Sequence, residues 1–157
     1  MILDKLLKVS DAQALTATAV GTSSVDLTTA RSIGTGEPMA VLFTVITAAD
    51  VADADEDYTF EAEFATAADQ STGREPIAEV SYQSGTPDAG TLDADLLVAG
   101  YQFAIGIPPR AASDVARYIG VRYTLAGSTP SVTMDASIVP QYTIAEFTPY
   151  PDGFTIS

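Results

Sequence analysis

Regular alternation of apolar and polar residues constrains the fold of this chain more than any other feature of its sequence. In residues 58–64, aromatic residues and an alanine occupy every second position, with threonine and glutamate between them. The same period of two recurs in residues 101–107, 119–125 and 132–138. A period of two is typical of a strand with one buried and one solvated face. The sequence therefore predicts antiparallel sheets.

Other segments complete an all-β pattern. Residues 39–47 form a nearly continuous apolar run rich in β-branched side chains, which predicts a central strand that is covered on both sides or faces a partner. Residues 77–82 and 24–27 are further strand candidates, and residues 126–130 are predicted to form a hairpin loop. Short strands separated by turn signals indicate an all-β fold, an antiparallel β-sandwich or jelly roll.

Helical signals are sparse. Ser10 is followed three residues later by Gln13, which is the pattern of a capping box, so a short helix is expected to begin there. Thr16, Thr18 and Val20 are better suited to a strand and limit its length.

Both ends of the chain differ from the middle. We expect an N-terminal arm over residues 1–22, a sandwich domain over residues 23–139 and a C-terminal extension over residues 140–157. The two ends carry large apolar side chains, and exposed apolar groups commonly mark contacts with a partner. The predicted partner-contact residues are Ile2, Leu3, Leu6, Leu7, Tyr142, Phe147, Tyr150 and Phe154.

Composition narrows the classes of partner. The 157 residues are enough for one domain with a real core. A formal net charge of −14 opposes binding to nucleic acid, which depends on Lys and Arg, and to anionic membrane surfaces. Asp4, Lys5 and Lys8 interrupt the apolar start of the chain, so neither a signal peptide nor a transmembrane span is expected.

Catalysis is not expected. The chain contains no His and no Cys, which excludes Ser–His and Cys–His nucleophile systems and zinc sites built on those ligands. Glu61 and Glu63 are about 6.6–6.8 Å apart by strand rise, a separation that suggests a glycosidase pair. The alternation places both on the solvated face, however, where nothing raises a pKa. We therefore predict that the protein is not an enzyme and uses no cofactor.

An acidic run over residues 50–57 is the densest charge cluster. Asp53, Asp55 and Asp57 alternate, so their oxygens are candidate ligands for Ca²⁺. The run lacks the glycine and the closing glutamate of an EF-hand loop. A solvated loop whose acids oppose pairing with another sheet edge is the favoured interpretation, without a metal.

A family resemblance is carried by five segments, residues 7–16 (LKVSDAQALT), 25–27 (VDL), 33–38 (IGTGEP), 107–109 (IPP) and 121–133 (VRYTLAGSTPSVT). In this order and spacing they resemble the jelly-roll capsid cement (decoration) proteins of tailed bacteriophages, of the type found on Bordetella phage. The similarity covers most of residues 1–139.

The resemblance implies a structural virion protein on the outer surface of an icosahedral capsid. Its implied partners are the major capsid protein, whose subunits it would bridge, and further copies of itself in a dimer or a trimer, with no nucleic acid and no membrane. Two alternatives stay open at this point: a carbohydrate- or Ca²⁺-binding β-sandwich module, and a tail or fibre component of the virion.

Overall fold

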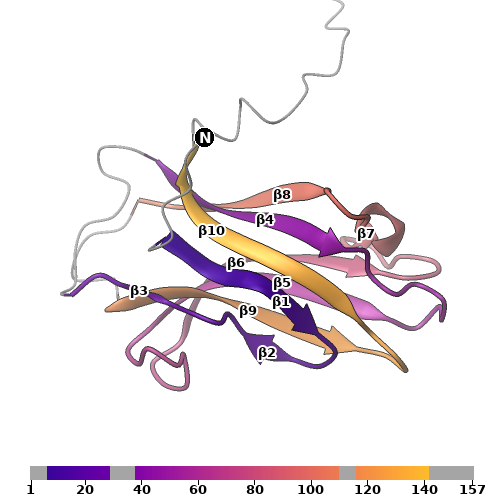
Figure 1. The fold of residues 1–157 in the computed structure, drawn as a ribbon, viewed down its shortest axis with the longest axis horizontal. Coiled ribbons are helices and arrows are strands. Elements are labelled where there is room, and N and C mark those ends of the chain that lie inside the picture. Colours follow the sequence, from indigo (N-terminus) through magenta and orange to yellow (C-terminus); the bar gives the residue numbers. More distant parts are fainter. Residues whose placement is uncertain (1–6, 29–37, 110–115, 142–157) are drawn as a thin grey trace, which may run out of the picture.

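Two sheets pack face to face in a computed structural model that describes residues 7–28, 38–109 and 116–141 (Figure 1). The first sheet has the order β1-β10-β4-β8 and the second the order β2-β9-β5-β6-β7, with β3 also paired to β9. No helix in the described ranges has the length and apolar composition needed to cross a membrane. The elements are β1 (Lys8–Leu15), β2 (Ala19–Val20), β3 (Val25–Asp26), β4 (Met39–Thr47), β5 (Asp57–Ala65), β6 (Glu75–Gln83), β7 (Leu92–Asp93), the 3₁₀ turn η2 (Ala94–Leu96), β8 (Gln102–Ile107), β9 (Tyr118–Ala126) and β10 (Val132–Pro140).

The strand pairing is that of one long hairpin rolled into a sandwich. The first strand pairs with the last, β1 with β10, and the next pairs inward are β2 and β3 with β9, β4 with β8, and β5 with β6. Rolling brings β10 beside β4 and β9 beside β5, which completes the two sheets. The predicted all-β sandwich is confirmed, and its connectivity is that of a jelly roll.

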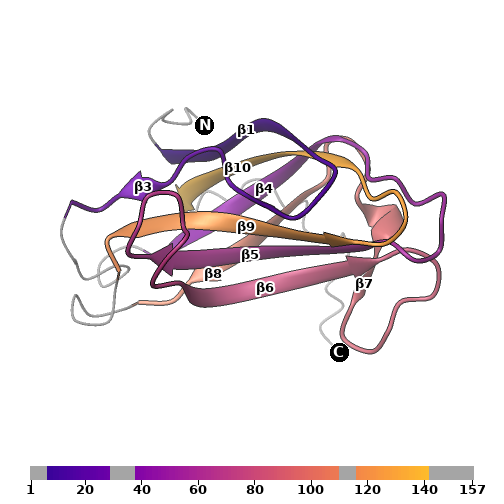
Figure 2. The ribbon, with the colours of Figure 1, turned by 90° about the horizontal axis from the view of Figure 1, so that it is seen from below.

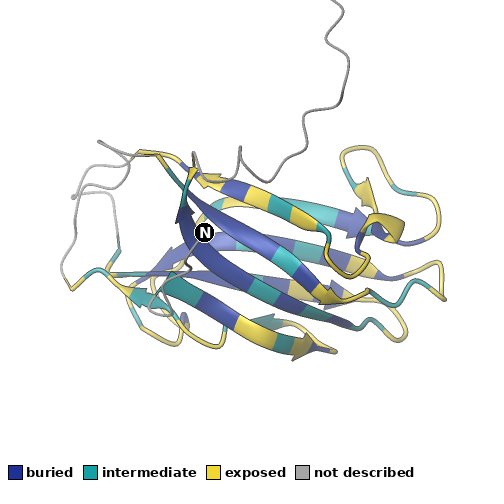
Figure 3. Ribbon diagram, turned by 45° about the horizontal axis from the view of Figure 1, so that its top comes forward, coloured by how far each residue is buried: buried dark blue, intermediate teal, exposed yellow. Residues whose placement is uncertain are grey.

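The core lies between the sheets and is aromatic at its centre. The alternating positions predicted to face inward do so, and the rings of Phe43, Phe60 and Tyr123 are completely buried. Phe60 lies 5.9 Å from Phe43 and 5.9 Å from Tyr123 between ring centroids, tilted or edge-on to each. Such tilted geometry suits the ring quadrupoles. Burial is densest along the middle strands, whereas the loops are mostly exposed (Figure 3).

The strongest strand predictions are confirmed. The segments with a period of two became β5, β8, β9 and β10, and the apolar run became β4, which lies between β10 and β8 with residues buried on both faces. Residues 127–131 form a loop, since Ala126 is the last residue of β9, but the predicted hairpin is wrong. They carry the chain from β9 in the second sheet to β10 in the first, so the two strands do not pair.

The start of the chain differs from the prediction. We expected an arm over residues 1–22, but residues 8–15 and 19–20 are strands of the two sheets. No helix begins at Ser10. The Ser10 hydroxyl accepts a hydrogen bond from the Tyr123 hydroxyl (2.7 Å) and donates to Gln13 Oε1 (2.9 Å), so the residues of the expected capping box join an irregular strand to the core. Ala12, with a φ of 43°, lies in a register break that obscures the period of two.

Candidate functional site

Of the predicted partner-contact residues, Leu7 lies within the described ranges. It is half-buried and packs against the core of its own sandwich. The other predicted contacts lie outside the described residues, as do residues 1–6 of the predicted arm and residues 142–157 of the predicted extension: Ile2, Leu3, Leu6, Tyr142, Phe147, Tyr150 and Phe154.

Large exposed apolar residues lie at one end of the sandwich, where β4 ends and where β7 and η2 lie (Figure 1). Ile46, Leu92, Leu96 and Val98 are large apolar residues that stay 43, 42, 44 and 55 % exposed. Three of these residues lie within residues 92–98. The backbone N–H of Ala49 donates to the Leu97 carbonyl (2.9 Å), which joins this stretch to the segment just after Ile46. We call these four residues the apolar corner. Large apolar side chains that stay exposed at one end of a domain are candidates for contact with a partner.

Sequence reasoning missed the apolar corner. The one signal available was the run Leu96-Leu97-Val98, which stands outside every alternating segment. In the structure Leu97 is buried and its two neighbours are exposed, because a 3₁₀ turn and the loop after it turn only one of the three side chains toward the core.

The acidic loop between β4 and β5 gathers three carboxylates, but not the three predicted. Asp53 and Asp55 lie with Glu56, and one carboxylate oxygen from each lies within 4.8 Å of the other two. Asp57 is outside this group, because it is the first residue of β5. The alternating pattern could have predicted the burial of Glu56, because Glu56 lies two residues before Tyr58 and four before Phe60, whose side chains face the core.

Two neighbouring loops hold the acidic loop in place. The Ser84 hydroxyl donates to the Asp53 carbonyl (2.6 Å) and accepts from the Glu56 amide (2.9 Å). From the β9–β10 loop, the Ser128 hydroxyl donates to Asp55 (2.9 Å), and the Thr129 hydroxyl lies 3.3 Å from Asp53 Oδ2 and 3.2 Å from Glu56 Oε1. The three loops therefore meet at one end of the sandwich.

Glu56 is the unusual member of this group. Its side chain is completely buried, and Oε2 has no hydrogen-bond partner among the described residues. A buried polar atom without a partner loses its hydration and gains nothing in return, so such atoms are rare and require an explanation.

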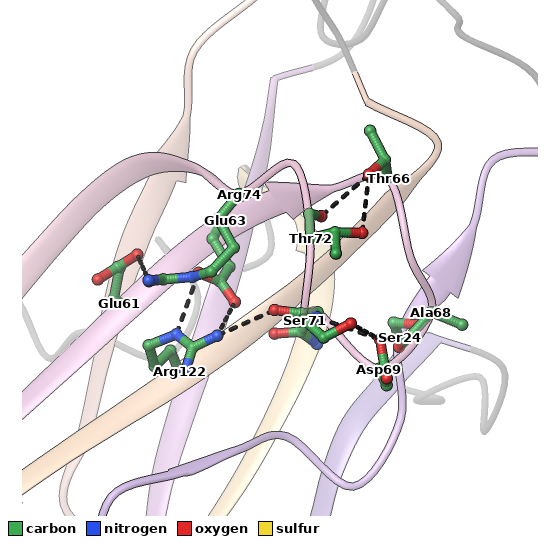
Figure 4. Close-up of polar contacts among 11 residues, drawn as sticks. Ser24, Glu61, Glu63, Thr66, Ala68, Asp69, Ser71, Thr72, Arg74 and Arg122 are labelled. Atoms are coloured by element: carbon green, nitrogen blue, oxygen red, sulfur yellow. Dashed lines mark hydrogen bonds and ion pairs between the residues drawn. The ribbon is translucent and has the colours of Figure 1, made fainter.

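A second buried glutamate, Glu63, lies in an ion network on the outer face of the second sheet (Figure 4). The prediction that Glu63 lies on a solvated face is wrong. Arg74 Nε donates to its Oε2 (2.7 Å), and Arg122 donates to Oε2 (3.3 Å) and Oε1 (3.2 Å). The β5–β6 loop carries Arg74 and covers the carboxylate, which alternation within β5 cannot reveal.

Gln70, at the tip of the same loop, completes the network. Its amide nitrogen, oriented toward Glu63, donates to Oε1 (2.8 Å) and to the Val121 carbonyl (3.0 Å). Arg122 also donates to the backbone carbonyl of Gln70 (3.1 Å). Glu63 thus receives four hydrogen bonds, which fills the acceptor sites of a carboxylate and leaves none for a substrate. Gly120 leaves the space for this amide, since a Cβ there would lie 1.9 Å from the nearer terminal atom of the Gln70 amide group.

Glu61 forms the outer edge of the network. Arg74 donates to it (3.1 Å), yet burial and the neighbouring Glu63 charge raise the pKa of Glu61 above its ordinary value. The hydrogen bond to Glu63 raises the pKa of Arg74. The pair that suggested a glycosidase is thus an electrostatic clamp between β5, β9 and the β5–β6 loop.

A shallow pocket of about 190 Å³ also lies on the second sheet. Most of its lining residues are of polar types and come from β5, β6 and the loop before β7, and its one aromatic residue, Tyr82, is buried. This pocket therefore offers no exposed ring on which a sugar could stack. The lining residues are Asp57, Thr59, Ser81, Tyr82, Gln83, Asp88 and Thr91.

Comparison with known proteins decides the family. The profile of the Bbp16 family matches residues 9–138, which is most of the chain. The chain belongs to the Bbp16 family. This is a Bordetella phage protein family, in agreement with the phage type of the resemblance, and it indicates a virion association. No curated protein matches the chain.

Proposed function

We propose that this Bbp16-family protein is a non-enzymatic structural component of the virion that binds the outer surface of the phage capsid and bridges major capsid protein subunits. The observation that carries the proposal is the apolar corner, a set of exposed apolar side chains on a β-sandwich whose family is a phage family. The resemblance to capsid cement proteins supplies the partner.

The chemistry of the surface supports this role. Each large apolar side chain of the apolar corner that becomes covered by a partner contributes about 25 cal/mol per Å² of buried area. A net charge of −14 suits the capsid exterior, because an inward surface would face packaged DNA. A dimer or trimer that contacts several capsid subunits gains further from effective concentration, so single contacts of modest strength suffice.

Co-sedimentation of the full chain with expanded capsid shells tests the proposal. We expect the wild type to pellet with shells at a copy number close to that of the major capsid protein. The double variant Leu96→Ser/Val98→Ser should bind at least ten-fold more weakly, with an unchanged Tm because both side chains are already exposed. The control Ala78→Ser alters an exposed residue of β6 and should bind like the wild type.

The predicted contacts in the terminal segments need a separate variant. Deletion of residues 142–157, which include Tyr142, Phe147, Tyr150 and Phe154, should weaken binding while the sandwich stays folded. Failure of the wild type to bind shells would overturn the proposal. A stoichiometry of a few copies per particle would favour a tail or fibre component instead.

A further inference from the structure

We propose that Asp53, Asp55 and Glu56 form a Ca²⁺ site at the loop end of the sandwich, with the Thr129 hydroxyl as a neighbouring oxygen ligand. This inference rests on the local geometry and holds whether or not the protein binds a capsid.

The spacing of the oxygens fits one ion. Ca²⁺ binds oxygen at 2.3–2.6 Å, so two ligands on opposite sides of the ion are about 4.6–5.2 Å apart. One carboxylate oxygen from each of the three residues lies within 4.8 Å of the others. A single ion can therefore contact all three without a large movement of the loop.

The buried, unpartnered Oε2 of Glu56 is the second and independent observation. A carboxylate brought completely out of water normally has donors on both oxygens. Among the described residues, Glu56 has only the Thr129 hydroxyl as a donor, on Oε1. That hydroxyl has one proton and lies equally close to Asp53, so it can satisfy only one of the two carboxylates at a time. A cation is the partner that completes this set.

No described cation serves the three carboxylates. Each Lys or Arg side chain in the described ranges bonds to an acid elsewhere: Lys8 to Asp11 and Asp135, Arg74 to Glu61 and Glu63, Arg117 to Asp26, and Arg122 to Glu63. Three like charges within 4.8 Å repel one another, and a divalent ion reverses that repulsion.

The ligand chemistry favours Ca²⁺ over other metals. All candidate ligands are oxygens, which suits hard cations. Mg²⁺ demands a near-ideal octahedron and retains most of its water, whereas Ca²⁺ tolerates irregular geometry and mixed ligands from loops. The bound ion would join the β4–β5 loop to the β9–β10 loop, which connects the two sheets.

Thermal unfolding of the full chain with CaCl₂, with MgCl₂ and with EDTA, at equal ionic strength, tests the site. At about 100 times the Kd, Ca²⁺ should raise the Tm by about 5–11 °C, and Mg²⁺ should have a much smaller effect. Calorimetric titration with Ca²⁺ should show saturable binding of one ion per chain.

Variants separate a site from general screening of negative charge. Glu56→Gln and Asp53→Asn should each lose the Ca²⁺-dependent rise in Tm. Asp57→Asn removes the same charge from the same run but lies outside the group, and should retain the full rise. Equal shifts with Ca²⁺ and Mg²⁺, an unchanged response in both Glu56→Gln and Asp53→Asn, or an absence of saturable binding would each overturn the proposal.

Discussion

Two glutamates of this sandwich are completely buried, and their surroundings are opposite. Glu63, on the outer face of the second sheet, receives four hydrogen bonds from two guanidinium groups and an amide. Glu56, at the loop end, has one weak hydroxyl donor and a second oxygen to which no described residue donates. Viewed from the side of the second sheet, β5 begins after the acidic loop at one end of the sandwich and ends before the β5–β6 loop at the other (Figure 2).

The difference separates a structural carboxylate from a binding one. Around Glu63 the chain supplies every donor, so the charge fastens the β5–β6 loop to the sheet and stays inaccessible. Around Glu56 the described residues supply acids and a hydroxyl, so their negative charge is left for a bound cation to neutralise. Burial alone therefore does not indicate function; the set of partners does.

Removal of the Glu63 carboxylate should have the largest effect. Arg122 is partly buried, and Glu63→Ala removes its carboxylate partner. Breaking such a pair lowers the free energy of unfolding by about 3–5 kcal/mol. Urea unfolding measures the loss. Glu79→Ala removes an exposed carboxylate of the neighbouring strand and should change the free energy of unfolding by less than about 0.5 kcal/mol. Equal losses in the two variants would mean that the network does not stabilise the fold.

Filling the space beside Gly120 should cause the second largest loss of stability. Gly120→Ala places a Cβ where the Gln70 amide lies, and overpacking of this kind costs about 1–3 kcal/mol. In a Gln70→Ala background the clash is gone, so the same substitution should cost less than about 1 kcal/mol. This double-mutant cycle measures the coupling. Additive losses would show that Gly120 and Gln70 act independently.

Glu56→Gln should act in the opposite direction to Glu63→Ala. In EDTA, the substitution removes one of three mutually repelling charges and adds an amide donor beside Asp53 and Asp55. We expect the free energy of unfolding to rise by about 1 kcal/mol, the size of one hydrogen bond. Urea unfolding again gives the value. A loss of several kcal/mol would instead place Glu56 with Glu63 as a structural carboxylate.

The exposed ion pair of Asp26 and Arg117 should have the smallest effect. Hydrogen bonds from Arg117 and the Thr28 amide lower the pKa of Asp26 from 3.8 to about 2. A lowered folded-state pKa stabilises the fold above pH 3.8, and this contribution is lost as the pH falls through about 2. Asp26→Asn should flatten the stability profile only in that window, and only slightly because the pair is solvated. Identical slopes in both proteins would contradict this prediction.

The sandwich was largely predictable because period-two patterns report directly on half-buried strands. Residues 58–64 and 132–138 alternate cleanly and lie within β5 and β10 as expected. The strand β1 was not predictable in the same way, since the register break at Ala12 interrupts its pattern.

The sites were harder to predict, for a different physical reason. Whether Glu63 is covered depends on a loop that folds back over the sheet, and this contact is not encoded in the alternation of β5. The grouping of Glu56 with Asp53 and Asp55 depends on how the chain turns before β5. The alternation of acids grouped Asp57 with Asp53 and Asp55, whereas the structure places Glu56 beside them.

The pairing of the first strand with the last also governs how this chain can fold. Lys8 lies opposite Ser137, so β1 has no partner until nearly the whole described sandwich has been synthesised. On the ribosome, the nascent chain must hold an unpaired strand until β10 emerges and closes the first sheet. Such long-range pairing gives a high contact order, and folds of this kind mature in about milliseconds to seconds. In an incomplete chain, the edges of β1 and β4 that wait for β10 are therefore where self-association would begin.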